Sequence, residues 1–362
     1  MTWSELRADR VLRDIQALCT ERATPLELLA SVSEAFHAAV PSDASCYCTF
    51  DPATTMVTSA VGRNLDENGR AAARFFELEY GRETPAQYQR LLASRAVSEV
   101  VDVAQMDATE GHVAVREHLT EMGVGQELRF LCTHQGAAWA GAGLMRSAGA
   151  RPFSAEEVAF AERVAALLTP AVRGSLVHAS ATINVAAEAG PAVLIMAGDQ
   201  LAEATPAALA WLEALSGIDR GHGELPAVVH AVAARALAGH TVAQRARTAD
   251  GCWVVLRAAP FPTGRAVVTF EVAGPAQVTS LLAGALGLTE REIDVVSAVL
   301  KGLATKEIAA ELHLSSYTVQ DHLKSVFAKA GVNSRRELVA EVFFGVYAPR
   351  LGGAVGADGF FR

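Results

Sequence analysis

The sequence predicts an α+β chain of several domains that ends in a module of four short helices. Three observations support this fold class. At 362 residues the chain exceeds the size of one ordinary domain. Hydrophobic residues make up 51% of the chain and charged residues 20%, a globular composition with ample apolar side chains for cores. Strand-like and helix-like apolar spacings are mixed along most of the sequence, but from about residue 288 only helical spacing remains.

The expected helices of the C-terminal module carry their own boundary signals. Thr289 and Glu292 fit the S/T-x-x-E capping box, in which each residue satisfies an orphan amide of the first turn. Gly302 and Gly331 supply the left-handed backbone that commonly ends a helix. Residues 313–315 form a turn of the length needed to swing the chain from the second helix into the third.

The third of these helices is predicted to have one polar and one apolar face. The polar face, at spacings of three, four and seven, consists of Tyr317, Gln320, Asp321 and Lys324. The opposite face, which should pack on the preceding helix, consists of Val319, Leu323, Val326 and Phe327. A short helix built this way after a tight turn suits the DNA major groove, which indicates a transcription regulator.

Taken together, these blocks resemble the LuxR/NarL-type helix-turn-helix over residues 286–345. The resemblance rests on Leu288-Thr-Glu-Arg-Glu, Gly302-Leu-Ala-Thr-Lys-Glu and Ser315-Ser-Tyr-Thr-Val, in family order and spacing. It implies binding of double-stranded DNA, usually as a homodimer on paired half-sites. The fourth helix commonly forms the dimer contact in this family, which here implicates Leu338, Val339, Val342 and Phe343.

The same resemblance assigns DNA contacts residue by residue. Those that correspond to phosphate-facing or groove-facing positions are Lys306, Thr318, Lys324, Lys329 and Arg335. Gln320 and Asp321 depart from the family pattern of a Lys and a small apolar residue. Gln can pair with adenine and Asp can accept from cytosine N4. Asp321 also repels phosphates, so a salt bridge that positions Lys324 is the alternative.

Charge and targeting signals restrict the class of protein. The chain carries a net charge of −9, almost all of it outside the helical module, which argues against a nucleic-acid or membrane role for the remainder. The module itself is near neutral, so moderate and salt-sensitive DNA affinity is expected. The N-terminus lacks the apolar core of a signal peptide, and no apolar run reaches membrane-spanning length. A cytoplasmic location is predicted.

Cysteine usage fits a reducing compartment. The five cysteines lack zinc-type spacing. Cys46 and Cys48 alternate in a predicted strand, so both point to one face, either as small core residues or as a redox-sensing pair with Cys132. His112 and His118 lack a metal-ligating partner three or four positions away. No metal and no cofactor are therefore predicted.

The N-terminal part, residues 10–178, resembles a GAF domain in the order of its elements. Helices are expected over 4–21, 25–39, 66–79 and 84–95, with paired strands, a hairpin at Gln135-Gly136 and a long exit helix after Pro152-Phe-Ser. Such domains are sensors that hold small ligands. The aromatic residues proposed to line a ligand site are Tyr47, Phe75, Phe76, Tyr80 and Trp139, although a place in the ordinary core or surface is the favoured explanation for each.

The middle region, residues 183–275, resembles a PAS domain. A buried strand from Gly190, two helices and a three-stranded meander with an Asp250-Gly251 turn carry the likeness. Such a domain binds a ligand or only dimerises, and the scarcity of polar interior candidates favours the second role. Residues 155–185 and 276–287 are expected to be connecting helices, and residues 346–362 a mobile tail.

The sequence thus predicts a DNA-binding transcription regulator, not an enzyme, whose N-terminal domains couple a small-molecule or redox signal to DNA binding. Two rival classes remain. A thiol reductase using Cys46, Cys48 or Cys132 requires an accessible thiolate of low pKa. A co-regulator that binds another factor in place of DNA leaves the C-terminal blocks unexplained.

Overall fold

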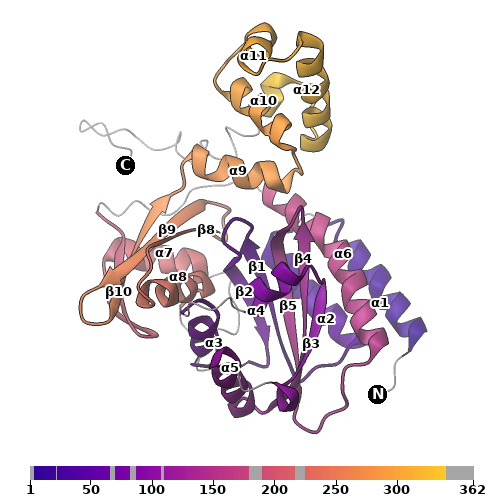
Figure 1. Cartoon of the computed structure of the whole chain (residues 1–362), viewed down its shortest axis with the longest axis vertical. Helices are drawn as coiled ribbons and strands as arrows, with labels where there is room; N and C mark the ends of the chain where they lie inside the picture. Colours follow the sequence, from indigo (N-terminus) through magenta and orange to yellow (C-terminus); the bar gives the residue numbers. More distant parts are fainter. Residues whose placement is uncertain are drawn as a thin grey trace. The chain divides into compact units, whose positions relative to one another are not determined.

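A computed structural model describes residues 4–21, 23–65, 70–81, 87–106, 110–178, 190–216 and 225–339 (Figure 1). The chain forms two compact units. The first contains residues 1–175, 185–249 and 254–272, and the second contains residues 176–184, 250–253 and 273–362. The first unit holds two five-stranded antiparallel sheets and the second is helical. The predicted mixed fold class, with a helical C-terminal module, is confirmed.

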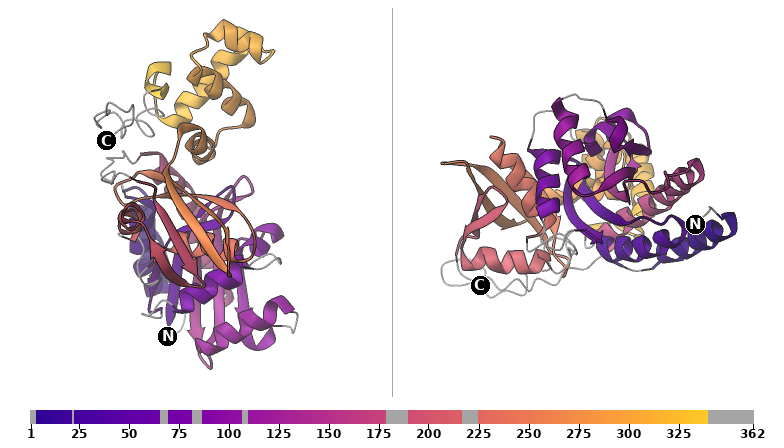
Figure 2. Two further views of the ribbon diagram at one scale, coloured as in Figure 1. Left: turned by 90° about the vertical axis from the view of Figure 1, so that its left-hand side faces the viewer. Right: turned by 90° about the horizontal axis from the view of Figure 1, so that it is seen from below.

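The first sheet has the strand order β2-β1-β5-β4-β3; its strands are labelled in Figure 1, and Figure 2 gives two further views. Its strands are β1 (Ala44–Asp51), β2 (Met56–Arg63), β3 (Ser98–Asp102), β4 (Val124–His134) and β5 (Ala137–Ser147). The β4–β5 hairpin turns at Gln135 and Gly136, as predicted. Both residues have positive φ, 51° and 77°, which suits a two-residue turn between twisted strands.

Helices cover both faces of this sheet. On one face lie α1 (Glu5–Leu18), α2 (Pro25–Ala39) and α6 (Ala155–His178), where Phe36 of α2 contacts the rings of Tyr47, Phe130 and Phe160. The other face carries α3 (Arg70–Tyr80), α4 (Gln87–Ser94) and α5 (Glu110–Glu121), with a 3₁₀ turn at Val103–Gln105. The predicted Ser154 cap of α6 is present, since its hydroxyl accepts from the Glu157 amide.

The second sheet repeats the same connectivity with the order β7-β6-β10-β9-β8. Its strands are β6 (Val193–Ala197), β7 (Gln200–Ala204), β8 (Val242–Arg247), β9 (Trp253–Phe261) and β10 (Arg265–Val272). Two helices, α7 (Pro206–Ser216) and α8 (Ala227–Leu237), pack against it. The two sheets therefore share one topology, in which the first strand pairs with the second and the last, and the last strand is central.

Helix α8 joins the two halves of this unit. Nine of its eleven residues are buried, which leaves it no solvated face. It packs on β8 and β10 of the second sheet and on α3 and β2 of the first half. The His230 ring of α8 stacks flat on the Phe76 ring of α3, with centroids 5.8 Å apart and planes 6° apart. A helix that is apolar all round is stable only when it is covered on all sides.

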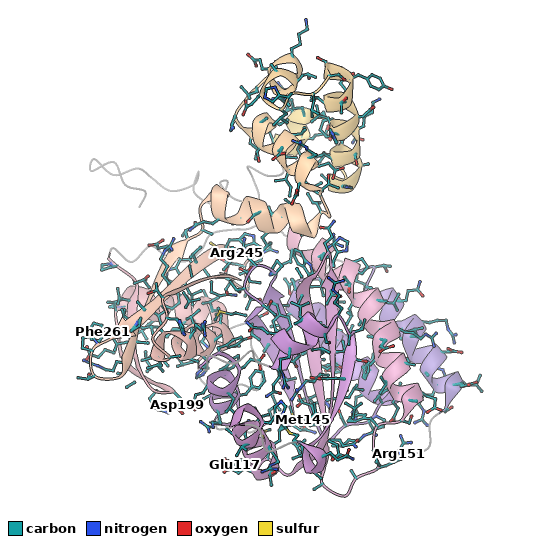
Figure 3. All side chains as sticks on the ribbon, in the orientation of Figure 1. Glu117, Met145, Arg151, Asp199, Arg245 and Phe261 are labelled. Atoms are coloured by element: carbon teal, nitrogen blue, oxygen red, sulfur yellow. The ribbon has the colours of Figure 1, made fainter. Side chains whose placement is uncertain are left out.

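Polar contacts reinforce this joint beside α8 (Figure 3). The Arg245 guanidinium of β8 donates two hydrogen bonds, of 2.7 and 2.5 Å, to the Asp51 carboxylate. The Asp51 side chain is only 2% exposed. The buried amide of Gln244 accepts from the Thr54 hydroxyl at 2.7 Å and donates to the Met56 carbonyl at 3.2 Å. The edge strand β8 is thereby fixed to the β1–β2 turn.

The second unit contains α9 (Pro275–Ala285), α10 (Glu290–Leu300), α11 (Thr305–Glu311) and α12 (Ser316–Ala330), followed by a helical segment at 335–339. Its core joins Val295, Ile308, Val319, Val326 and Leu338, all buried. The predicted boundaries are confirmed: Thr289 and Glu292 form a capping box, and Gly302 and Gly331 have φ of 86° and 67°.

Two elements were absent from the sequence predictions. Helix α5 occupies a stretch interpreted as part of a polar loop, because its apolar positions Val115 and Leu119 are few and become a helix face only by packing with Leu78 and Val124. Strand β7 was also not predicted. It is a five-residue edge strand, mostly exposed, and among the described strands it pairs with β6 alone. No helix in the described ranges is long and apolar enough to cross a membrane.

The Asp51–Arg245 pair yields a stability prediction. D51N removes the negative charge of a buried ion pair, so the free energy of unfolding of the first unit should fall by about 3 kcal/mol. The matched control is E271Q, because the Glu271–Arg257 pair is about half exposed and should change stability by less than about 0.5 kcal/mol. Thermal denaturation followed by circular dichroism compares the two variants, and equal effects would contradict the prediction.

Candidate DNA-binding face and ligand cavity

The polar face of α12 is open to solvent as predicted. Tyr317 is 71% exposed, and Gln320, Asp321 and Lys324 are exposed beside it. Val319, Leu323 and Val326 hold the opposite side in the core. The helix starts at Ser315, whose hydroxyl accepts from the Thr318 amide at 3.0 Å. The helix therefore presents a continuous polar ridge from its first turn onward.

Asp321 and Lys324 lie within reach of each other on this ridge. The carboxylate and ammonium are 3.5 Å apart, and both side chains are at least half exposed. An exposed pair of this kind contributes little to stability, so both groups remain available for other partners. Lys306, near the start of α11, is also exposed. Thr318 is half-buried, and its hydroxyl lies 2.8 Å from that of Ser315.

Lys329 and Arg335, two other predicted DNA contacts, are engaged inside the module. The Lys329 ammonium lies 2.6 Å from the Glu292 carboxylate and donates to the Gly287 carbonyl at 3.1 Å. The Arg335 guanidinium donates to the carbonyls of Val299 and Leu303, at the end of α10. Both cations thus tie helices of the module together. Their role in DNA contact stays a prediction.

Glu292 is the centre of the first of these contacts. Burial alone would raise the pKa of its carboxyl. Hydrogen bonds from Lys329, Ser325 and the Thr289 amide outweigh burial and lower that pKa to about 2. Because the folded-state pKa lies below the ordinary 4.5, the stabilisation is present above pH 4.5 and is lost as pH falls toward 2.

The residues predicted for dimer contact fall into two groups. Leu338 is 1% exposed and packs in the core of its own module, and Val339 packs against that core. Leu338 therefore has little surface to offer a second copy. Val342 and Phe343 lie outside the described residues.

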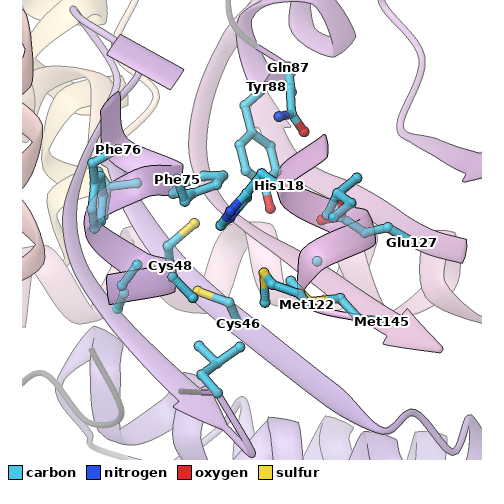
Figure 4. Close-up of a pocket in the computed structure, with 17 residues that line it drawn as sticks. Cys46, Cys48, Phe75, Phe76, Gln87, Tyr88, His118, Met122, Glu127 and Met145 are labelled. Atoms are coloured by element: carbon cyan, nitrogen blue, oxygen red, sulfur yellow. The ribbon is translucent and has the colours of Figure 1, made fainter. Parts of the chain in front are cut away.

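A cavity of about 50 Å³ lies in the first unit, between the sheet and helices α3, α4 and α5 (Figure 4). We call it the α3 cavity. Its lining is mainly apolar and includes Val57, Ala72, Phe75, Phe76, Leu119 and Met122. The polar lining residues are Gln87, Tyr88, His118 and Glu127. Burial, followed by the Arg74 charge, lowers the pKa of His118 and favours its neutral form.

Only part of the predicted aromatic set meets at this cavity. Phe75 and Phe76 line it. Tyr47 packs against Phe36 and Phe130 on the other face of the sheet. Tyr80 is buried, and its hydroxyl donates to the Thr55 carbonyl in the β1–β2 turn. The Trp139 ring lies under the Arg173 guanidinium. Gln87 and Glu127 were missed, because a polar side chain gives no sequence signal of burial until the sheet is assembled.

Cys48 and Cys132, two of the cysteines considered for redox chemistry, are buried, and none of the five cysteines forms a disulfide bond in the described structure. Cys46 and Cys48 share the cavity face of β1, as predicted. Burial raises the pKa of Cys48 well above its ordinary value, and that of Cys132 to about 12. Protonated, buried thiols are poor nucleophiles, which disfavours thiol reductase chemistry. Among the described residues no cluster of three potential ligands suits a metal ion.

Glu79 is a buried carboxyl next to the cavity, and its titration is testable. Burial raises its pKa to about 7, against the lowering effect of the Tyr88 and Gln87 amides that it accepts from at 3.0 Å. A folded-state pKa above 4.5 means that this contribution to stability is present below pH 4.5 and is lost as pH rises to 7 and beyond. The full loss is about 3 kcal/mol. Unfolding measured from pH 4 to 8 should show this decline in the wild type and a flatter profile in E79Q.

A second prediction separates internal from available lysines. K329M leaves the buried Glu292 carboxylate without its cation and should destabilise the second unit by about 2 kcal/mol. K324M removes an exposed charge of the same type and should change stability by less than about 0.5 kcal/mol. Hydrogen exchange of the α12 amides reports on this unit alone. Unchanged protection in K329M would show that the Lys329–Glu292 contact is not structural.

Solved structures were compared with the whole chain. The phycocyanobilin-bound GAF domain from a cyanobacterial phytochrome aligns with 48% of this chain and 97% of its own, at 18% identity and a TM-score of 0.36. SdiA in complex with octanoyl-rac-glycerol aligns with 95% of this chain and 97% of its own, at 12% identity and a TM-score of 0.31.

Sequence comparisons concern the C-terminal module. Residues 286–342 match the family model described as bacterial regulatory proteins, luxR family. Over 52 residues the chain is 48% identical to the transcriptional regulatory protein YdfI of Bacillus subtilis, covering 14% of this chain and 24% of that protein. Over 55 residues it is 40% identical to the spore germination protein GerE of the same species, covering 15% of this chain and 74% of GerE. Because this match covers most of GerE, the chain belongs to the luxR family of bacterial regulatory proteins.

Proposed function

We propose that this chain is a sequence-specific DNA-binding transcription regulator that acts as a homodimer. The observation that carries the proposal is the exposed polar ridge of α12, held on a fully packed core. Its aromatic, amide, carboxylate and ammonium groups stand on one exposed helix face, from which side chains of these types can contact base edges in a major groove. An α-helix fits that groove, and a second copy would place an equivalent helix on a neighbouring half-site.

The proposed division of labour on α12 follows from exposure. Gln320 reads a base edge, for which its amide offers the donor and acceptor that adenine needs. Lys324 and Lys306 neutralise phosphates. Asp321 has two roles open to it, base reading or positioning of Lys324 through their 3.5 Å contact. Because Lys329 and Arg335 are tied to the module, few free cations remain, so the salt dependence should be modest.

The first unit serves in this proposal as a sensor. Its first half is GAF-like and holds the α3 cavity. Its second half is PAS-like, and the order of its strands supports this interpretation. The route between them is short, because Phe76 lines the cavity and also stacks on His230 of α8. A displacement of α3 at the cavity wall would therefore be transmitted through α8 to the second sheet. An effector of unknown identity would shift the equilibrium between two arrangements of the dimer.

Selection from random duplex DNA, followed by sequencing, tests the function. Full-length protein should enrich an inverted repeat with half-sites about one helical turn apart. Sedimentation of the protein with the selected duplex should give two chains per site. Failure of the full-length protein and of the C-terminal module alike to enrich any sequence would refute direct DNA recognition and favour the co-regulator alternative.

On the selected duplex, single variants should act differently. K324A should weaken binding to all sequences and reduce the slope of log affinity against log salt by about 1. Q320A should cost about 1–3 kcal/mol and relax the preference at one base pair. R291A removes an equally exposed cation on α10, away from the polar ridge, and should leave binding nearly unchanged. Equal losses in K324A and R291A would mean that the charge of the module matters and the ridge does not.

A further inference from the structure

The sheet face of the α3 cavity carries a buried carboxylate with one oxygen turned to the cavity. Glu127 Oε2 is paired with Arg129 at 2.5 Å, and both side chains are nearly inaccessible to solvent. A Cβ added at Gly143, which lines the cavity, would stand 2.5 Å from Glu127 Oε1 and 3.3 Å from the Tyr88 hydroxyl. Within the described residues no donor binds Oε1. Because Gly143 has no side chain, the space in front of Glu127 Oε1 stays open to the cavity (Figure 4).

The charges around this point favour a cation. Arg129 is the buried guanidinium on this face of β4, and two carboxylates, Glu127 and Glu99, already share it. Glu79 adds a third acid nearby. Burial raises the pKa of Tyr88, and the neighbouring Glu127 carboxylate is among the groups that raise it further. His118, the remaining basic group in the lining, is held neutral by its lowered pKa.

The size and lining of the cavity limit what enters. A volume of about 50 Å³ accommodates about four water-sized groups, at roughly 10–15 Å³ each. Apart from Glu127, Tyr88, Gln87 and His118 the walls are mainly apolar, formed by Phe75, Phe76 and Met122 among others. A site with one acidic end and mainly apolar walls orients a ligand that has one polar head and a short hydrocarbon body.

We infer that the α3 cavity binds a small alkylammonium cation, with its head on Glu127 Oε1 and the Tyr88 hydroxyl and its chain against Phe75 and Phe76. An ammonium supplies three donors and a positive charge, which meets the free carboxylate oxygen and the hydroxyl together. A carboxylate or phosphate ligand would face Glu127 with like charge. The inference rests on the proposed sensor role, because it names the class of effector that this site would take.

Three probes of nearly equal size test the head group on the full-length protein. They are n-propylammonium, 1-propanol and propionate, each added at constant ionic strength. Propylammonium should raise the melting temperature saturably, by about 2–4 °C at a tenfold excess over its Kd, and should show saturation transfer from protein to ligand in NMR. Propanol should give a smaller shift and propionate none. A shift from propionate as large as that from propylammonium, or no response to any probe, overturns the inference.

Two variants locate the site. A72L fills the apolar wall and should abolish the propylammonium response. E127Q keeps the volume, leaves Arg129 paired with Glu99, and should erase the preference for propylammonium over propanol. E117Q is the control, because Glu117 lies on the exposed side of α5, and its response should equal that of the wild type. If A72L does not fold, E127Q alone tests the inference. An unchanged preference for propylammonium over propanol in E127Q would then refute it.

DNA retention of the same preparations, without probe, keeps this test separate from that of the function. Normal DNA binding with no propylammonium response refutes the inference and leaves the regulator standing. If the protein binds no DNA but shows a propylammonium response that E127Q abolishes, the inference stands and the regulator function is refuted. When both hold, titration of propylammonium against the selected duplex should change its affinity, and hydrogen exchange in α8 should change with it.

Discussion

The burial of α8 is the constraint on which the first unit depends. This helix has almost no polar face, since alanine and valine dominate it and nine of its eleven residues are buried. One sheet covers only one side of a helix, so α8 needs a second partner, which α3 and β2 provide. The two sheets therefore form one unit because both halves are needed to bury the shared helix α8, and not because a linker alone connects them. The buried Asp51–Arg245 pair fixes the register of that contact.

This arrangement has a functional consequence, because one helix serves two purposes. The inner side of α3 closes the cavity, and the Phe76 ring also stacks on His230. Packed interiors are dense and do not deform continuously, so an added group in the cavity must move a neighbour or be excluded. The neighbour that connects to the second sheet is α3. In the proposed sensor role, α3 would connect the cavity with the second sheet through its contact with α8.

The helical module shows how few charges a DNA-binding face requires when the rest are used for folding. Lys329 neutralises the buried Glu292, and Arg335 caps the carbonyls at the end of α10. These two cations stabilise the platform from which α12 projects. Lys324 and Lys306 remain exposed, as their proposed contacts with phosphates require. Specificity in such a module depends on the side chains of α12 more than on its net charge, because direct base contacts carry sequence information and phosphate contacts do not.

Sequence alone determined the elements whose signals are local. The capping box at Thr289, the glycines that end α10 and α12, and the polar ridge of α12 were all predictable, because they depend on residues within one or two helical turns. The same holds for the β4–β5 hairpin. Helix α5 and edge strand β7 escaped prediction, since weakly patterned segments take their structure from the surfaces they pack against.

Only the tertiary structure decided what the charged and buried polar residues do. The partner of Lys329 lies 37 positions away, so no local pattern separates this lysine from the exposed Lys324. Glu127 faces a cavity because sheet pairing brings Gly143 beside it, and α8 becomes a joint because β2 and α3 come to its second side. These roles depend on contacts between distant segments. A sequence pattern records the periodicity of one element, whereas burial and pairing are properties of the assembled chain.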